Sequence, residues 1–194
     1  MRAISFLRSS GLALALVATA LPALAQDLPN LREARRLVFA ERGAVEVELI
    51  EHESLSDTDR AILMSPQLSG AISYYGAIAI APGMGLASEA TVAAANYHDE
   101  DNARRVALEG CEEARSSGPS CAVVLVVRPD GWEPGRPLQL NTEASAALRG
   151  DFRRMGRPRA MAISDATGQW GLGEDEETAV ANCGQDDCRV VVQD

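Results

Sequence analysis

Lysine is absent from this sequence of 194 residues, in which all 18 basic side chains are arginine. Without lysine the chain cannot form a Schiff base with pyridoxal phosphate or with a carbonyl substrate. The lysine of a nucleotide-binding P-loop is missing for the same reason. Pyridoxal enzymes and P-loop nucleotidases are therefore excluded.

Catalytic motifs are also scarce. Histidine occurs twice, and aromatic residues make up 4% of the chain. The Gly-x-Ser-x-Gly motif of many hydrolases does not occur. The Gly-Met-Gly run at 83–85 lacks the third glycine of a dinucleotide-binding fingerprint. The sequence therefore predicts no cofactor and no metal centre, and it identifies no catalytic residue.

The first 25 residues have the composition of a secretory signal. Arg2 and Arg8 precede an apolar run at 11–20, and an Ala-Leu-Ala cleavage motif at 23–25 stands before Gln26. The apolar run is too short to favour a membrane span, and no cysteine follows the cleavage site to carry a lipid. We therefore expect a soluble protein in the periplasm or outside the cell, without a stable membrane anchor.

The mature chain is strongly acidic. The formal charge of −10 becomes −12 when the two signal arginines are removed. Nucleic-acid-binding proteins need a basic face, so nucleic acid is not expected as a partner. Removing 25 of the 194 residues leaves 169, which fits one domain with a core of its own.

One pattern of segments occurs twice. The first copy has a Gly-Ala-Ile-Ala-Ile segment at 76–80, a helical pattern that ends at Cys111, and an apolar segment that starts at Cys121. The second copy has Ala-Met-Ala-Ile at 160–163 and a helical pattern that ends at Cys183. Its last apolar segment starts at Cys188, so the four cysteines occupy equivalent positions in the two copies.

Four cysteines in an exported chain predict two disulfides, for which three pairings exist. The duplication favours Cys111–Cys121 together with Cys183–Cys188. A four-cysteine zinc site is the alternative, but spacings of ten and five residues are unusual for zinc and the compartment is oxidising.

The periodicity and the cap residues give the expected elements. Helices are predicted at 27–42, at 57–64 with Ser56 as N-cap, from the His98-Asp99 cap to near Cys111, at 142–154 and at 174–182. Strands are predicted at 44–50, 77–81, 121–127, 160–164, 169–173 and 189–192. Residues 65–73 read as a linker, and 86–96 as a return strand or a helix.

These elements define the domain organisation. After the signal at 1–25 come an N-terminal extension at 26–73, the first copy at 74–127, a connector at 128–159 and the second copy at 160–194. Each copy reads strand–strand–helix–strand. The fully apolar segment at 121–127 is typical of a central strand. We therefore predict an α+β fold in which both copies share one mainly antiparallel sheet with helices on one face.

The repeated segments resemble a bacterial secreted family of unknown function with tandem copies of a GAIA strand, a Trp-Gly pair, an alanine-rich helix and a cysteine pair. The likeness covers the chain from Tyr75 to its end and is strongest in the second copy. The first copy departs from it, because Gly85-Leu86 stands where the second copy has Trp170-Gly171. The resemblance implies an architecture and a compartment but no activity.

A wider stretch, from Tyr74-Tyr75-Gly76 to Gly131-Trp132-Glu133, is similar to short exported proteins of GC-rich bacteria. Some of these carry an aminolevulinate-synthase label. Such a synthase needs a pyridoxal lysine, and this chain has none. We therefore reject that activity.

Three groups of residues are candidates for binding. His98 caps a helix and, with Asp99 and Asp101, has the residue types of a metal site, although neither the spacing nor the ligand number is diagnostic. Trp132 and Trp170 either line a groove for a peptide or glycan or pack in the core. The remaining candidates form the only basic cluster of the acidic chain: Arg149, Arg153, Arg154, Arg157 and Arg159.

The arginine cluster has two interpretations. Its members either pair with the protein's own carboxylates or form a patch that docks an anion or a partner, because guanidinium groups bind carboxylate and phosphate bidentately.

The leading functional hypothesis is a non-enzymatic binding module of the bacterial envelope, whose partner is an envelope protein or a small ligand. The alternative is a secreted hydrolase that uses His98 with nearby carboxylates. An inhibitor or toxin-like module is a third class, without support from any specific residue.

Overall fold

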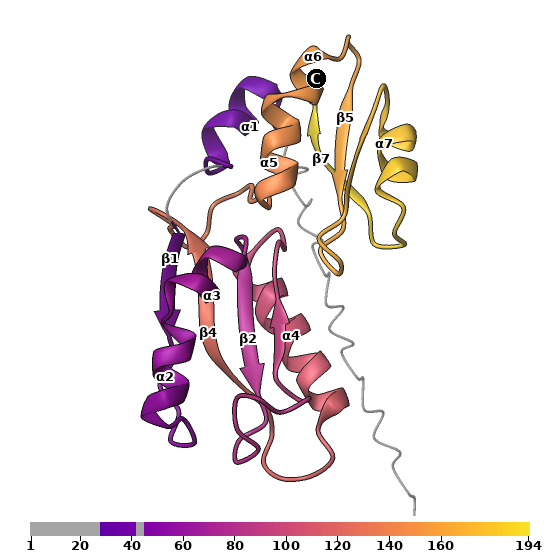
Figure 1. Ribbon diagram of the computed structural model, residues 1–194. Helices are drawn as coiled ribbons and strands as arrows, with labels where there is room; N and C mark the ends of the chain where they lie inside the picture. Colours follow the sequence, from indigo (N-terminus) through magenta and orange to yellow (C-terminus); the bar gives the residue numbers. More distant parts are fainter. Residues whose placement is uncertain (1–27, 42–44) are drawn as a thin grey trace, which may run out of the picture.

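The computed structural model describes residues 28–41 and 45–194, so the predicted signal peptide lies outside the described residues (Figure 1). The fold is α+β, as predicted, and every strand pair is antiparallel. The helices are α1 (Leu31–Leu37), α2 (Asp57–Leu63), α3 (Pro66–Ala71), α4 (Glu100–Ala114), α5 (Thr142–Arg149), α6 (Asp151–Arg154) and α7 (Glu176–Cys183). The strands are β1 (Val45–Leu49), β2 (Gly76–Ile80), β3 (Val92–Ala94), β4 (Ala122–Pro129), β5 (Ala160–Ile163), β6 (Trp170–Gly173) and β7 (Arg189–Gln193).

The two copies form two sheets, and the prediction of one shared sheet is wrong. The first sheet has the order β1-β4-β2-β3, and the second has the order β6-β5-β7. In the first sheet β1, from the N-terminal extension, pairs with the outer edge of β4. That edge is therefore unavailable to a strand of the second copy. The connector forms α5 and α6 rather than a strand that would bridge the sheets.

The two units nevertheless have the same topology. Unit 1 consists of β2, β3, α4 and β4, and unit 2 of β5, β6, α7 and β7. In each unit the first strand lies between the other two. Each first strand also has an irregular register with the last strand, between Ile78 and Ala79 and between Met161 and Ala162. The unpaired residues opposite these steps are Val124 and Val191, which lie at the same distance from their cysteines.

Helices cover both faces of each sheet, not one face as predicted. In β2 the alanines pack on α4, in the cluster that contains Ala103 and Ala107. The isoleucines Ile78 and Ile80 face the other way and pack with Leu63 of α2. Because the side chains of a strand alternate between faces, small residues let α4 approach closely while large residues fill the opposite layer.

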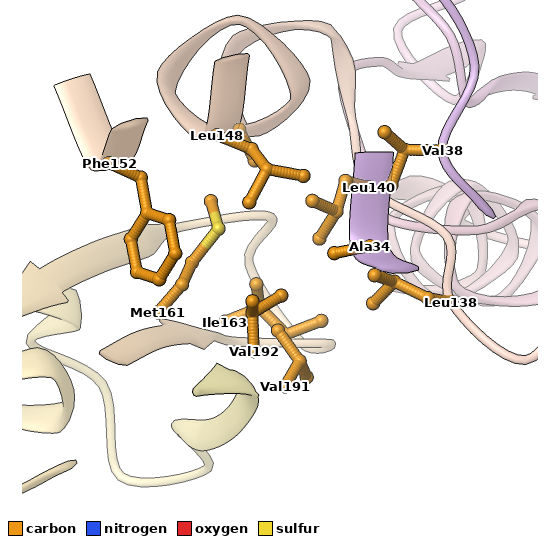
Figure 2. Close-up of a cluster of buried hydrophobic side chains, with 11 residues drawn as sticks. Ala34, Val38, Leu138, Leu140, Leu148, Phe152, Met161, Ile163, Val191 and Val192 are labelled. Carbon is orange, nitrogen blue, oxygen red and sulfur yellow. The ribbon is translucent and has the colours of Figure 1, made fainter. Parts of the chain in front are cut away.

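The same alternation occurs in unit 2. Ala160 and Ala162 pack on α7, whereas Met161 and Ile163 pack on the opposite face (Figure 2). There they contact side chains from α1, α5, α6 and the preceding loop, and the buried members of this cluster include Ala34, Val38, Leu138, Leu140, Leu148 and Phe152.

Close packing of α7 on β6 depends on glycine. A Cβ at Gly171 would lie closer than 3.0 Å to main-chain atoms of Ala179, Asn182 and Cys183. The register places Gly171 opposite Ala162, and the equivalent position of unit 1 is Val92, opposite Ala79. In unit 1 the glycine belongs to the helix instead.

That helical glycine is Gly110, whose added Cβ would lie 3.1 Å from Val92 Cγ1. The pair Trp170-Gly171 thus matches Thr91-Val92 in space. The sequence alignment with Gly85-Leu86 is wrong, because those residues lie in the loop before β3.

The N-terminal extension is divided between the two units. Helix α1 packs against α5 and β7 of the second half, and the main-chain nitrogen of Gln193 donates to the carbonyl of Pro29 (3.2 Å). Strand β1, α2 and α3 belong to the first sheet and its outer layer. The extension therefore links both units from the outside, as Figure 1 shows.

Several boundaries differ from the predictions. The proposed linker at 65–73 contains α3, capped by Ser65 with Pro66 at the first turn. The proposed helix at 142–154 is interrupted at Gly150, which ends α5 and precedes α6. The return segment at 86–96 contains only three strand residues, those of β3. The N-caps Ser56 and Asp99 are confirmed.

Both predicted disulfides are present, Cys111–Cys121 and Cys183–Cys188, with Cα–Cα distances of 6.1 and 6.2 Å. Each joins the end of a unit's helix to the start of its last strand. On the chain-entropy model each contributes about 2–3 kcal/mol. In the ranges that the structure describes, no helix is both long and apolar enough to cross a membrane.

Candidate functional site

A cleft of about 700 Å³ opens where α1, the start of α4 and unit 2 meet. We call it the junction cleft. Its apolar wall includes Leu28, Pro29, Leu37, Pro137, Leu138, Ile163 and Val191, and its polar groups include Glu33, Arg36, His98, Asp99, Arg136, Gln139, Asp165 and Arg189. None of these residues is one of the strand alanines or glycines on which α4 and α7 pack.

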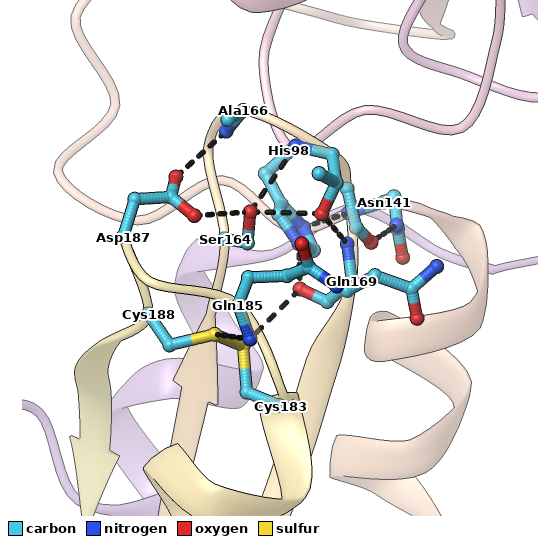
Figure 3. Close-up of a disulfide and its surroundings, with 11 residues drawn as sticks. His98, Asn141, Ser164, Ala166, Gln169, Cys183, Gln185, Asp187 and Cys188 are labelled. Atoms are coloured by element: carbon cyan, nitrogen blue, oxygen red, sulfur yellow. Dashed lines mark hydrogen bonds between the residues drawn. A yellow bond between two sulfur atoms is a disulfide. The ribbon is translucent and has the colours of Figure 1, made fainter.

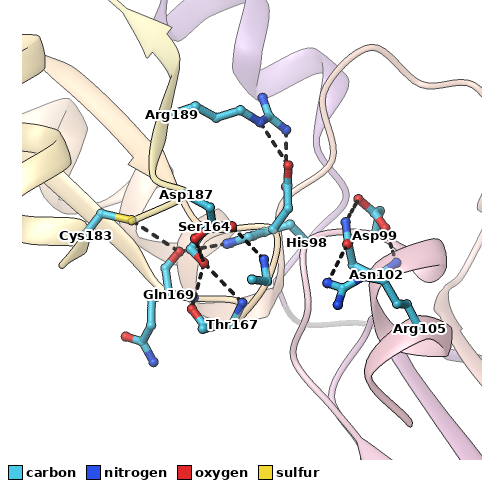
Figure 4. A network of polar contacts seen from close by, with 12 residues as sticks. His98, Asp99, Asn102, Arg105, Ser164, Thr167, Gln169, Cys183, Asp187 and Arg189 are labelled. Atoms are coloured by element: carbon cyan, nitrogen blue, oxygen red, sulfur yellow. Dashed lines mark hydrogen bonds and ion pairs between the residues drawn. The ribbon is translucent and has the colours of Figure 1, made fainter. Parts of the chain in front are cut away.

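Most charged groups of the junction cleft are already paired. Arg189 donates to both carboxylate oxygens of Asp165, at 2.9 and 3.2 Å (Figure 4). Arg136 donates to the carbonyl of Leu37 (2.8 Å) and lies over the ring of Phe39. Arg36 is exposed and has no side-chain partner among the described residues. Judged by the residues that the structure describes, the cleft therefore offers one free cation beside an apolar wall.

His98 lies at the inner end of this cleft with 1% of its surface exposed. Its Nε2 lies 3.1 Å from the carbonyl oxygen of Gln169, and its Nδ1 accepts from the main-chain nitrogen of Asn141 (3.2 Å) (Figure 3). A carbonyl only accepts and an amide N–H only donates, so Nε2 carries the proton and the ring is neutral. Burial lowers the pKa of His98, and the bond to the Gln169 carbonyl opposes that shift only partly.

This geometry leaves His98 no free nitrogen for a metal or a substrate. Asp99 is occupied as the N-cap of α4 and accepts from the main-chain and side-chain nitrogens of Asn102 (2.7 and 2.8 Å). Asp101 is exposed. Among the described residues, no group of three or more potential ligands could hold a metal ion. His98 is therefore placed as a structural link between the units.

Asn141 is the second part of this link, and sequence reasoning missed it. The side chain is fully buried. Its Nδ2 donates to the carbonyl of Asn96 in unit 1 and to that of Gly168 in unit 2, both at 2.8 Å. Its Oδ1 accepts from Ala144 N (2.8 Å) and caps α5. The only sequence signal was an asparagine directly before a helical pattern.

A polar network fastens the loop beside His98 to the second disulfide loop (Figure 3). The hydroxyl of Ser164, which is fully buried, donates to Asp187 Oδ1 (2.6 Å) and accepts from Thr167. The other carboxylate oxygen of Asp187 accepts from Ala166 N (2.8 Å). Hydrogen bonding to Ser164 holds the pKa of Asp187 below its ordinary value. The serine is thus committed to the loop and is not positioned as a nucleophile.

No protein-family model, curated protein or solved structure matches this chain. The resemblance to a secreted family therefore stays a prediction. The function has to be inferred from the geometry of the surface.

The predicted arginine cluster separates into paired and unpaired members. Arg149 donates to the carbonyls of Phe39 and Val38 at 2.9 and 3.2 Å. Arg154 pairs with Asp151. Arg159 is buried, pairs with Asp194 and donates to main-chain carbonyls at the end of α6. For these three residues, the ion-pair interpretation describes the structure.

Arg153 and Arg157 have a different environment, although Arg157 also pairs with Asp194 (2.8 Å). Together with Arg32, Arg35 and Arg36 of α1 they line a groove of about 470 Å³, completed by Asn30 and Leu31. We call it the arginine groove. A helix was predicted at 27–42, of which Leu31–Leu37 is helical. Its place beside Arg153 and Arg157 was not predicted, because that depends on how α1 docks on α5 and β7.

The two tryptophans do not form one aromatic groove. Trp132 packs against the core of unit 1 beneath Arg128, whose guanidinium lies 4.5 Å from the ring centroid. Its Nε1 donates to Gln139 (3.1 Å). Trp170 is half-buried in β6 and packs against the cluster of unit 2. Each tryptophan is thus largely engaged by its own unit.

Proposed function

We propose that this chain is an exported, non-enzymatic binding protein of the bacterial envelope. Its binding site is the junction cleft, and its ligand is a small molecule or a peptide end with an apolar body and one acidic group. The observation that carries the proposal is the composition of the cleft: an apolar wall next to Arg36, the one cation of the cleft that has no partner among the described residues.

The state of the other polar groups supports binding over hydrolysis. A general base needs a nitrogen within reach of the substrate, and both ring nitrogens of His98 are engaged by main-chain groups. The buried hydroxyl of Ser164, which stands between the cleft residues Ile163 and Asp165 in the sequence, donates to Asp187. Pockets that bind small molecules combine an apolar wall with polar groups that fix orientation. This cleft has both, and most of its polar groups are already paired.

Export and internal duplication are part of the proposal. The signal-like segment at 1–25 and the two disulfides support an oxidising compartment. The shared order of elements and the matching register steps support duplication. In this account the duplicated units form the scaffold, and the cleft is built where they meet α1.

An apolar anion tests the proposal. The probe 8-anilinonaphthalene-1-sulfonate combines an aromatic body with one sulfonate, and its fluorescence rises when it leaves water. We expect it to bind the folded protein, and the Arg36→Gln variant to bind it about tenfold more weakly, because a hydrogen bond to a charged group contributes about 1.5–3 kcal/mol.

Arg35 provides the matched control. It lies one residue away on α1 and is also exposed, but it lines only the arginine groove. Arg35→Gln should therefore bind the probe as the unaltered protein does. Equal losses in both variants, or no binding to the unaltered protein, would refute the junction cleft as the site.

A further inference from the structure

Within residues 28–41 and 45–194, the arginines without a side-chain partner all lie in one place. The structure describes 15 arginines, and 11 of them donate to a carboxylate or to a main-chain carbonyl. The other four have no side-chain partner in the described ranges, and all four line the arginine groove: Arg32, Arg35, Arg36 and Arg153. The fifth member, Arg157, pairs with Asp194 but keeps 70% of its side chain exposed.

This concentration is unexpected for so acidic a chain. Acidic residues outnumber basic ones by 28 to 18, yet no carboxylate of the described part of the chain lines the groove. On α1, Arg32 lies three residues before Arg35 and four before Arg36, so these like charges share one side of the helix and are held close together. Like charges at this helical spacing repel, so the arrangement disfavours the free protein and favours a bound anion.

The chemistry of the groove selects the kind of anion. Guanidinium groups bind phosphate oxygens bidentately, and arginine is the preferred residue for that contact. Several guanidiniums around about 470 Å³ need a ligand that carries several negative charges in a small volume. Clustered phosphates meet this requirement, whereas the carboxylates of a peptide are spread along its chain.

The remainder of the protein limits the size of the ligand. A membrane surface or a long polyanion would extend beyond the groove over a protein whose net charge is negative, which disfavours it. A compact ligand touches only the groove, because screening confines the interaction to about 8 Å at physiological ionic strength.

We propose that the arginine groove is a second binding site, specific for a compact ligand with two or more linked or neighbouring phosphates. The site is distinct from the junction cleft, although Arg36 borders both. It is formed by α1 of the N-terminal extension and by the end of α6 and the residues after it in the connector, so it lies outside both duplicated units.

Calorimetry with inorganic tripolyphosphate at physiological ionic strength tests this site. We expect binding by the unaltered protein and a weakening of about 100-fold in the double variant Arg32→Gln/Arg153→Gln, roughly tenfold for each charged hydrogen-bonding group lost. The matched control is Arg60→Gln/Arg105→Gln, which removes two arginines that are paired elsewhere. That control should bind as the unaltered protein does.

Two further measurements distinguish a free polyphosphate from a carboxylate ligand and from a membrane surface. Citrate, a compact tricarboxylate, should bind at least tenfold more weakly, and vesicles containing phosphatidic acid should not retain the protein. The double variant should melt no lower than the unaltered protein, since its two side chains are exposed and unpaired. Equal weakening in the control variant, tighter binding of citrate or retention on the vesicles would overturn the proposal.

The Arg35→Gln variant gives a second test. It should weaken the binding of tripolyphosphate while leaving the binding of the sulfonate probe unaffected.

Discussion

The Gly171→Ala variant is expected to lose about 3 kcal/mol of unfolding free energy, at the upper end of the range for overpacked sites. The added methyl would lie closer than 3.0 Å to main-chain atoms of three α7 residues. Main-chain atoms cannot move aside as a flexible side chain can, so α7 would have to shift as a whole. Gly171 lies in a strand conformation that alanine also adopts, so the cost is steric rather than conformational.

Thermal unfolding measures this effect. For a chain of this length the melting temperature should fall by on the order of 10 °C. The control is Gly156→Ala, where the new methyl would meet no atom within 4 Å and stability should change by no more than about 1 kcal/mol. If both variants melted alike, α7 would not pack on β6 as described.

The Asn141→Ala variant is expected to lose about 4 kcal/mol. The substitution removes the partner of the part-buried carbonyl of Asn96, of the buried carbonyl of Gly168 and of the buried amide of Ala144. A buried group left without a hydrogen bond costs about 1–3 kcal/mol, and loss of the N-cap adds about 1 kcal/mol. Because Asn141 bonds to both units, its loss should weaken their attachment.

Urea denaturation followed by circular dichroism provides the measurement. Asn182→Ala is the matched control, since that exposed asparagine makes one side-chain bond, to the carbonyl of Leu172 (2.7 Å). The control should lose no more than about 1 kcal/mol. A loss below about 1 kcal/mol for Asn141→Ala would show that this residue does not link the units.

Local features of the fold could be predicted because their signals are local. The N-caps Ser56 and Asp99 depend on residues a few positions apart, and each disulfide joins cysteines only ten or five residues apart. The alternation of β1 also identified a strand. It did not reveal that β1 pairs with β4, because strand pairing depends on contacts across many residues.

The same limit applies to the candidate sites. Arg149 and Arg153 are neighbours in sequence but have opposite environments, because the helix is interrupted at Gly150. Arg149 reaches the carbonyls that follow α1, whereas Arg153 borders the groove. The partners of His98 are equally distant, with Gln169 71 residues away along the chain. Composition identified His98 and the arginines as unusual, but only the tertiary contacts assign their roles.

The central claim of this account is that the two units meet at a neutral, structural His98 beside a binding cleft. Because burial lowers the pKa of His98 in the folded state below its ordinary value of 6.5, protonation opposes folding. The stability that the neutral ring contributes is complete above pH 6.5 and is lost as the pH falls through the lowered pKa.

Nuclear magnetic resonance of the histidine side chains, labelled with nitrogen-15 and recorded from pH 5 to 8, tests this claim most directly. His52, which is half-buried and lies outside the cleft, supplies the second signal. The account predicts that His98 is a neutral ring with its proton on Nε2 and titrates below pH 6.5. A proton on Nδ1, or an imidazolium that persists above pH 6.5, would contradict it.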